Sequence, residues 1–403
     1  MPCRFAASTT LNLITTLNLI LGTACFAQNY TQTNLVSNKG GVAPVTDPKL
    51  INAWGLSRGS GSPWWVSDEA TGVSTLYGGA GAKQSLIVTI PPADPTKTKT
   101  GSPTGTISNG SQTDFLLAPG EPAAFLFSTV DGTIAAWNPN VAVAQGATPP
   151  STHAVTVVKA TEGSSYTGLT SAFIDGKRYL YAANFGKGRV DVYDNAFHLV
   201  KVPNEQVDLN SGDQNEPSSE NVFMDNELPP HYVPFNVQTI GNDIVVAYAL
   251  HEEGSLFETD GPGLGFVDIY SSTGRLLKRL EHGDWLNAPW GVALAALDFG
   301  RFSHDLLVGQ FAGGGDTQSS GFIAAYDLAT GKLDGLLQDA SGNPLAIHGI
   351  WALSPGNITP SNSDAAAVPA AEMYFTAGPN RGSGGLFGFL TAVSTQLTEG
   401  NSQ

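Results

Sequence analysis

The fold is decided by four short runs between residues 289 and 337: Pro-Trp-Gly-Val-Ala (289–293), Leu-Leu-Val-Gly-Gln (306–310), Gly-Phe-Ile-Ala-Ala-Tyr (321–326) and Lys-Leu-Asp-Gly-Leu-Leu (332–337). Each run is apolar or alternates between apolar and polar residues, and turn-forming residues separate the runs, which is typical of short β-strands. No long stretch of the chain keeps the 3.6-residue apolar period of a helix. The sequence therefore predicts an all-β protein.

The same unit recurs along the chain. Its first, small-residue run is found at 53–57, 123–127, 167–170, 235–238, 289–293 and 350–353, and its third, alternating run at 72–77, 132–137, 188–193, 265–270, 321–326 and 385–390. Several units add a fourth run, as at 276–280 and 332–337. Radial repetition of four-stranded units is a β-propeller, and small residues suit the crowded innermost strand. Six copies predict a six-bladed β-propeller.

The two ends of the repeat region complement each other. The last unit runs out of chain soon after its third run, whereas the run Tyr30–Val36 near the start belongs to no unit. If this run is the outer strand of the last blade, the ring closes and an open sheet edge is covered. We therefore expect one closed propeller domain over residues 28–395, followed by a polar tail, residues 396–403.

Residues 1–27 have the features of a secretory signal peptide: the cation Arg4, an apolar run from Leu11 to Leu21 and a small residue, Ala27, before the polar Gln28. Cleavage there would remove Cys3 and Cys25 and leave a cysteine-free chain. Lipid attachment at Cys25 is the alternative. The apolar run is too short to span a bilayer. We expect a secreted protein, extracellular or periplasmic, that is not inserted in a membrane.

The charge balance restricts the partners. Lys and Arg number 19 against 35 Asp and Glu, for a formal net charge of −16, which argues against nucleic acid as a partner. Residues 202–274 contain 13 Asp and Glu and no Lys or Arg. This stretch is either a solvated insertion or a loop that binds a cation, and a partner of this face is expected to be cationic or a metal ion rather than anionic. The protein itself is expected to be a monomer.

The combination of Asp47-Pro48, Trp54-Gly55-Leu56 and Asn287-Ala288-Pro289-Trp290-Gly291 resembles an uncharacterised family of secreted propeller proteins found chiefly in bacteria. Some members carry a C-terminal surface-sorting signal, which this sequence lacks. More distantly, the repeat is similar to NHL-repeat propellers and to the calcium-dependent gluconolactonase and phosphotriesterase propellers. The resemblance implies a secreted six-bladed propeller, and it brings no activity with it.

Polar residues at the starts of inner strands face the axis of a propeller, and in this chain they are Asn52, Glu121, Asn236, Asn287 and His348. Glu121, Asn236 and Asn287 resemble the cage of oxygen ligands that calcium-dependent lactonases build around their axis, so they are the predicted calcium ligands. Such a metal would polarise a lactone carbonyl or a phosphoryl oxygen, with His348 as proton-transfer partner. The alternative is that the Asn side chains bond the backbone between blades and that Glu121 is solvated in a turn.

Three hypotheses for the function follow. The first is a binding scaffold for an extracellular or envelope ligand, the second a calcium-dependent hydrolase of the lactonase or phosphotriesterase type, and the third a structural surface protein that acts in an array. The recurring Trp54, Trp290 and Trp351 are interpreted as packing between blades rather than as a sugar-stacking surface. Whether the protein is an enzyme stays open.

Overall fold

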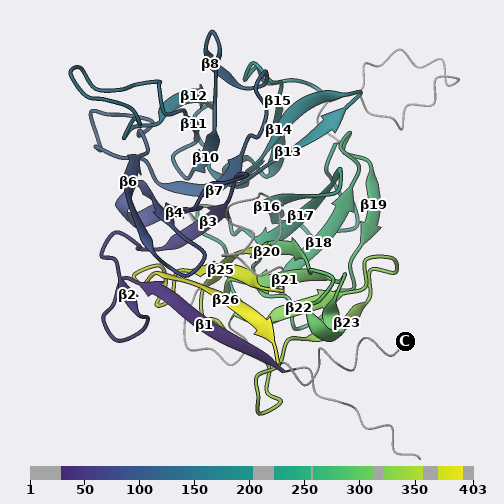
Figure 1. Cartoon of the computed structure of the whole chain (residues 1–403). Coiled ribbons are helices and arrows are strands. Elements are labelled where there is room, and N and C mark those ends of the chain that lie inside the picture. Colours follow the sequence, from purple (N-terminus) through teal and green to yellow (C-terminus); the bar gives the residue numbers. More distant parts are fainter. Residues whose placement is uncertain (1–28, 203–221, 256, 313–320, 357–370, 394–403) are drawn as a thin grey trace, which may run out of the picture.

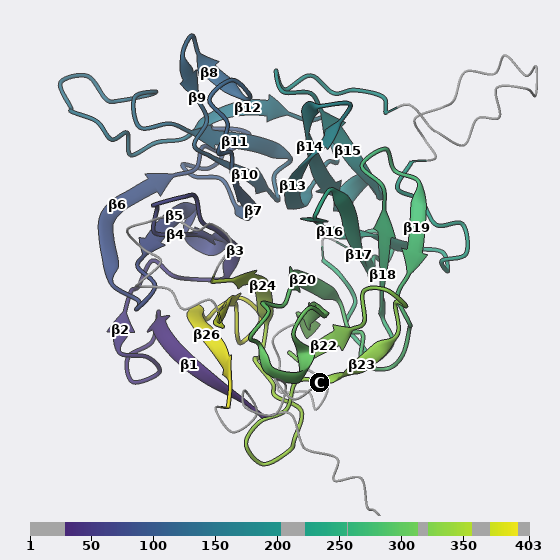
Figure 2. The same ribbon diagram turned by 45° about the vertical axis from the view of Figure 1, so that its right-hand side comes forward.

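The computed structural model describes residues 29–202, 222–255, 257–312, 321–356 and 371–393. Within these residues the regular structure is almost entirely β, and the strands form six sheets around a ring, with a small hairpin beside them (Figures 1 and 2). The predicted all-β, six-bladed propeller is confirmed. The predicted signal peptide, residues 1–27, and the polar tail, residues 396–403, lie outside the described residues. Among the described residues, no helix has the length and apolar character needed to cross a bilayer.

Each sheet is one blade, whose strands follow one another from the centre of the ring outward. Blade 1 contains, in that order, β3 (Ala53–Ser57), β4 (Trp64–Asp68), β5 (Val73–Tyr77) and β6 (Lys83–Thr89), and blade 2 contains β7 (Pro103–Ser108), β10 (Phe125–Thr129), β11 (Thr133–Trp137) and β12 (Val155–Lys159). Blade 3 contains β13 (Tyr166–Ile174), β14 (Lys177–Asn184) and β15 (Arg189–Tyr193), and blade 4 contains β16 (Tyr232–Ile240), β17 (Asp243–Leu250), β18 (Gly265–Tyr270) and β19 (Leu276–Arg279). Blade 5 contains β20 (Pro289–Leu294), β21 (Leu306–Gln310), β22 (Ile323–Tyr326) and β23 (Leu333–Leu336), and blade 6 contains β24 (Ile350–Pro355), β25 (Met373–Ala377), β26 (Leu386–Ala392), β1 (Tyr30–Ser37) and β2 (Val45–Thr46).

The innermost strand of blade 2 differs from the sequence-based prediction. Residues 123–127 were expected there, but β10 (Phe125–Thr129) is the second strand, and β7 (Pro103–Ser108) lies inside it. The run Pro-Thr-Gly-Thr-Ile-Ser was missed because Ile107 is its one aliphatic side chain besides Pro103 and it shows no apolar alternation; Pro103 stands at the strand start, where proline is tolerated. Because residues 123–127 were expected to form the innermost strand, Glu121, which precedes them, was wrongly assigned to the axis of the ring.

The N-terminal strand closes the ring, as predicted. β1 pairs antiparallel with β26 from Tyr30 opposite Ala392 to Ser37 opposite Leu386, so strands from the two ends of the described chain lie side by side (Figure 2). Tyr30 is buried, its hydroxyl donates a hydrogen bond of 2.9 Å to the carbonyl of Phe299, and the two rings lie 4.8 Å apart. The β1 strand is therefore fastened to blade 5 as well as to blade 6.

The core lies between the blades. One buried cluster joins Leu307, Ile323 and Ala325 of blade 5 to Ile350 and Phe375 of blade 6, and similar clusters fill the space between other neighbouring blades. Sheet packed face to face on sheet buries the alternating apolar side chains of both. Each blade is thus covered by its two neighbours.

Glycines let the innermost strands of neighbouring blades touch backbone to backbone. A Cβ atom on Gly55 would lie 2.3 Å from the carbonyl oxygen of Thr104 in blade 2. A Cβ on Gly291 would lie 2.3 Å from the carbonyl oxygen of Trp351 in blade 6. A side chain at either position would force the blades apart, which explains why the first run of the repeat is built of small residues.

Candidate functional site

Five of the innermost strands are irregular near their starts. The register shifts between Ala53 and Leu56 in β3, and the corresponding shifts in β13, β16, β20 and β24 fall at 166–168, 234–236, 289–291 and 350–353. A bulge bends a strand and re-aims the side chain within it. The side chains at these irregularities are Trp54, Thr167, Phe235, Trp290 and Trp351.

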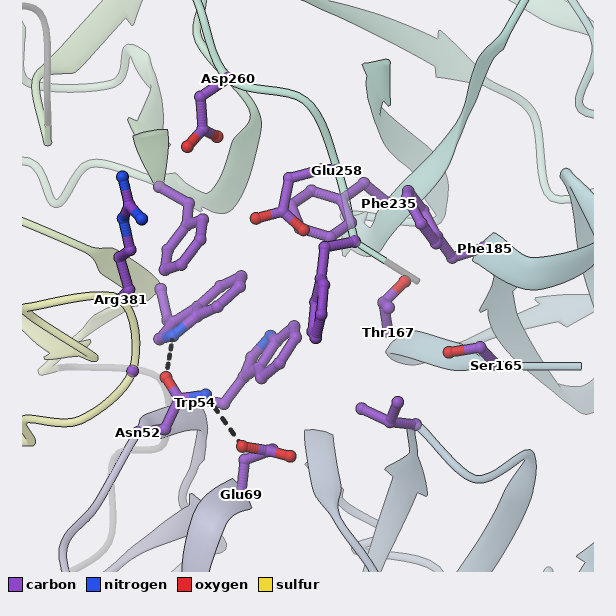
Figure 3. A pocket seen from close by; sticks show the side chains of 15 residues that line it. Asn52, Trp54, Glu69, Ser165, Thr167, Phe185, Phe235, Glu258, Asp260 and Arg381 are labelled. Carbon is purple, nitrogen blue, oxygen red and sulfur yellow. Dashed lines mark hydrogen bonds between the residues drawn. The ribbon is translucent and has the colours of Figure 1, made fainter. Parts of the chain in front are cut away.

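Four of these five side chains line a cavity of about 440 Å³ at the centre of the ring (Figure 3). Its lining combines six aromatic side chains with seven polar or charged ones: Asn52, Trp54, Glu69, Val130, Ser165, Thr167, Phe185, Phe235, Phe257, Glu258, Asp260, Phe311, Trp351, Arg381 and Gly382. Small-molecule sites in proteins have this size and this mixture of an apolar wall with a few polar groups. We call this cavity the axial pocket.

A stack of three rings forms one wall of the axial pocket. Trp351 lies between Trp54, at a centroid distance of 3.6 Å, and Phe311, at 3.7 Å, and both pairs are nearly parallel. Trp290 meets both tryptophans edge-on, and its Nε1 donates to the carbonyl of Thr167. All three tryptophans are buried, which confirms their predicted packing role. The prediction missed that Trp54 and Trp351 also face the pocket.

Asn52 connects this wall to a carboxylate. The Nε1 of Trp351 donates to Oδ1 of Asn52 at 2.8 Å, and Nδ2 of Asn52 donates to Oε2 of Glu69 at 3.0 Å (Figure 3). Asn52 has a φ of 49°, a left-handed conformation that asparagine tolerates better than most residues. This chain of hydrogen bonds holds Glu69, in the 3-10 turn η1 (Glu69–Thr71), at the edge of the pocket.

The other carboxylates come from the mouth loop, residues 257–264, which leads into β18. Burial, together with the nearby charge of Asp260, raises the pKa of Glu258 to about 7. Burial raises the pKa of Asp260 to about 6, while the Arg381 guanidinium acts in the opposite direction. Both carboxyl groups at the pocket thus have pKa values raised toward neutral pH, and shifts of this kind cluster at functional sites.

Two buried polar atoms in the pocket lining have no hydrogen-bond partner among the described residues. They are the indole Nε1 of Trp54 and the Oγ1 of Thr167, both on strand irregularities. Native interiors leave few buried polar atoms unpaired, and those few concentrate where structure serves function.

The structure gives the three predicted calcium ligands separate surroundings. Glu121 lies on β9 (Glu121–Pro122), which pairs with β8 (Leu116–Ala118) in the hairpin outside the blades, and its Oε2 accepts from Asn140 at 3.1 Å. Asn236 is buried on β16, and its Nδ2 donates to the carbonyl of Trp290 at 2.7 Å. Asn236 thus bonds the backbone of the neighbouring blade, which is the alternative to calcium binding that the sequence left open.

Asn287 holds the mouth loop in place. Its Oδ1 accepts from the backbone N–H of Gly261 at 2.8 Å, and Ala288 N–H donates to the carbonyl of Leu264 at 3.0 Å. His348, the predicted proton-transfer partner, lines a different cavity of about 320 Å³ together with Asn38 and Lys39. Of the five predicted axial residues, Asn52 alone lines the axial pocket. Among the described residues, no group of three His, Cys, Asp or Glu side chains is placed to hold a metal ion.

Glu69, Glu258, Asp260 and Arg381 were not predicted as site residues. The excess of acidic residues over 202–274, from which a cationic or metal-ion partner was expected, includes Glu258 and Asp260. It could not indicate which of its 13 carboxylates reach the axis, because that depends on how the mouth loop folds against Asn287.

Comparison with known proteins supports the fold. One uncharacterized protein of Acanthamoeba polyphaga mimivirus is 27% identical to this chain over 361 residues, which cover 88% of this chain and 78% of the viral protein. A second uncharacterized protein of the same virus is 28% identical over 366 residues, which cover 88% of this chain and 84% of the viral protein. No family model matches the chain. These relatives are viral, so they do not bear out the secreted bacterial family expected from the sequence.

Among solved structures, the pyrroloquinoline-quinone-bound aldose sugar dehydrogenase of Streptomyces coelicolor matches with a TM-score of 0.50 and 11% identity, over 91% of this chain and 99% of that one. A streptogramin B lyase matches with a TM-score of 0.47 and 9% identity, over 91% and 98%. At such identities the likeness speaks for the fold alone. By its own sheets and by this likeness, the chain is a six-bladed β-propeller.

Proposed function

We propose that this protein is a secreted β-propeller that binds a small extracellular molecule in the axial pocket. The observation that carries the proposal is the cavity of about 440 Å³ at the centre of the ring, whose lining includes six aromatic side chains. All six blades contribute side chains to it, four by an irregularity near the start of the inner strand and two, with Val130 and Phe311, by a loop that follows the second strand, so the cavity belongs to the architecture as a whole.

The pocket is suited to binding because its walls are fixed. Trp351 is clamped between two rings, and its Nε1 is bonded to Asn52. A wall that does not rearrange loses little conformational entropy when a ligand enters, which favours affinity. Charged groups at the edge, Glu69 and Arg381 among them, supply the directional contacts that an apolar wall lacks.

A screen of small soluble molecules by ligand-observed NMR tests this proposal. A Val130→Trp variant places a large side chain in the pocket, and Leu297→Trp, at an exposed position, adds the same side chain outside it. We expect bound molecules to be lost with the first variant and kept with the second. Hits that bind both variants equally, or a broad screen without any hit, would contradict the proposal.

Secretion is part of the proposal and needs its own measurement. The full chain, expressed in a bacterial host, should appear in the periplasm or medium with an N-terminus at Gln28, as shown by mass spectrometry of the intact protein. Light scattering of the purified protein should give the mass of a monomer. Retention of residues 1–27 in the cytoplasm would contradict the first expectation, and a lipid on Cys25 would favour the alternative mode of attachment.

The calcium-dependent hydrolase stays a prediction from sequence that no contact among the described residues favours. Asn236 and Asn287 use their amide groups in bonds to the protein backbone, and Glu121 belongs to an outer hairpin. Metal analysis of the purified protein and a thermal melt with and without a chelator test it, because a metal bound to the folded state raises the melting temperature.

A further inference from the structure

We propose that the ligand of the axial pocket is an organic cation, whose ammonium-type group lies between the aromatic wall and the carboxylates at the pocket edge. This inference rests on the proposed function, since it names the class of molecule that the same pocket takes.

The charge of the lining is the first argument. Among the described residues that line the pocket, the carboxylates are Glu69, Glu258 and Asp260, and the cation is Arg381. They approach from different sides, Glu69 from η1 and the other two from the mouth loop (Figure 3). With three carboxylates against one guanidinium, the lining is negative on balance when the carboxylates are ionised, and an excess of one sign of charge in a cleft raises the local concentration of oppositely charged ligands. The pocket therefore selects against anions.

The aromatic wall is the second argument, and it distinguishes an organic cation from a metal ion. A metal ion such as calcium needs several oxygen ligands around it, and the described residues offer no cluster of that kind. An alkylammonium group is stabilised by aromatic rings as well as by carboxylates. The negative face of a ring attracts the cation, and the carbon substituents of the ammonium group lose water on contact with the ring. Trp54, Phe257 and Phe311 supply such rings in the same lining as the carboxylates.

The third argument is that binding and ionisation are linked. Burial raises the pKa of Glu258 to about 7 and that of Asp260 to about 6, so part of their population is protonated near neutral pH. A bound cation favours the ionised carboxylates, and binding must release protons. The affinity for a permanent cation should therefore rise between about pH 5 and pH 8 and then level off. The other titratable or charged groups that the structure describes around the mouth loop are Glu69, His251, His282, Asp284 and Arg381.

Calorimetric titration with three molecules of the same shape tests the inference: choline, its neutral carbon isostere 3,3-dimethylbutan-1-ol, and the anion 3,3-dimethylbutanoate. We expect choline to bind roughly tenfold more tightly than the neutral alcohol, a ratio within the range of cation–π and carboxylate contacts. Choline titrated in buffers of different ionisation enthalpy should release protons at about pH 6.5.

Variants assign the effect to residues. Glu258→Gln and Asp260→Asn should each weaken choline binding several-fold at about pH 8, flatten its pH dependence and leave the affinity for the alcohol unchanged. Glu253→Gln removes the same charge from an exposed position upstream of the mouth loop, and it should behave like the wild type. Melting curves establish that each variant is folded, and the two carboxylates give independent tests.

The outcomes separate this inference from the proposed function. If the alcohol or the anion binds as tightly as choline, and Val130→Trp abolishes that binding, the pocket is a ligand site but its ligand is not selected for positive charge. If choline binds but Glu258→Gln and Asp260→Asn change nothing, the inference is likewise overturned. If neither these molecules nor the wider screen bind in a way that Val130→Trp abolishes, the proposed function itself fails.

Discussion

Replacing Gly55 by alanine tests whether direct backbone contact between the inner strands holds the ring together. Gly55 lies in β3, and the added methyl group would meet three backbone atoms of blade 2: the Thr104 oxygen at 2.3 Å, the Thr106 nitrogen at 2.8 Å and the Gly105 carbon at 3.0 Å. Carbon atoms in ordinary contact with such atoms lie well beyond 3 Å. Because no flexible side chain is involved, relief requires one blade to move away from the other.

The expected loss of stability follows from two opposing terms. Overpacking of a rigid site costs about 1–3 kcal/mol, and backbone on both sides places Gly55 at the upper end. Alanine also restricts the unfolded chain, which stabilises the folded state by about 0.4–1 kcal/mol. The net effect of Gly55→Ala is a loss of about 2 kcal/mol. Gly40→Ala, in an exposed turn with no atom within 4 Å of the added Cβ, should show the stabilising term alone.

The difference between the two variants isolates the clash. It should reach about 3 kcal/mol, which corresponds to roughly 4 °C between the melting temperatures of a domain of this size, because unfolding entropy is ~2 cal/mol/K per residue. Urea midpoints of the wild type and both variants provide the second measurement. Equal midpoints for Gly55→Ala and Gly40→Ala would show that the inner strands adjust freely, and the explanation of the small-residue run would be wrong.

Three other predictions concern closure, titration and metal. Tyr30→Ala should lower the free energy of unfolding by about 3–5 kcal/mol, because it leaves a cavity in a buried site and removes the hydrogen bond to Phe299. Limited proteolysis should then cleave the chain near β1. Thr31→Ala, at an exposed position, is the control, and equal protection of both variants from the protease would refute the prediction. Burial raises the pKa of Asp268 to about 7, and the Asp225 charge adds to this effect. In the unfolded chain this carboxyl ionises at about pH 4, so between about pH 4 and pH 7 only the folded state keeps the proton. The free energy of unfolding of the wild type should therefore fall, relative to Asp268→Asn, by up to about 1.4 kcal/mol per pH unit over this range and stay constant above it. Parallel curves of stability against pH for the two proteins would contradict this. Calcium at millimolar concentration should leave the melting temperature unchanged, because the one predicted carboxylate ligand, Glu121, lies in the outer hairpin and the amide oxygen of Asn287 already accepts from Gly261. A rise that a chelator reverses would revive the predicted calcium site.

The fold could be predicted because its signal is repeated. Most blades show the same order of a small-residue run, an apolar run and an alternating run that often ends in a buried tyrosine such as Tyr193, Tyr270 or Tyr326. The closing strand was predicted from the missing outer run of the last unit, and β1 covers Tyr30–Ser37 where Tyr30–Val36 was expected. Blade 2 was misassigned at its first strand because the Pro103–Ser108 run carries no apolar alternation.

The site could be predicted in kind but not in detail. Residues at the starts of inner strands were expected to meet at the axis, and Asn52 does line the pocket. The other lining residues lie within strand irregularities, as Trp54 and Phe235 do, or in loops and turns between strands. Trp54 and Phe235 immediately precede Gly55 and Asn236, the residues at which neighbouring strands make contact. Periodicity shows that a strand is present, whereas an irregularity depends on the pairing of two strands, so the direction of these side chains could not be read from the sequence.

The position of the pocket makes ligand binding a property of the closed ring. Trp54 of blade 1 stacks on Trp351 of blade 6, and the hydroxyl of Thr376 in blade 6 donates to the carbonyl of Trp54. The aromatic wall therefore spans the junction that β1 closes. Opening this junction would separate Trp54 from Trp351 even if every blade kept its sheet. Glycines such as Gly55 and Gly291 allow the inner strands to touch backbone to backbone. The closed ring of six blades thereby fixes the distances between the aromatic side chains that a ligand would contact.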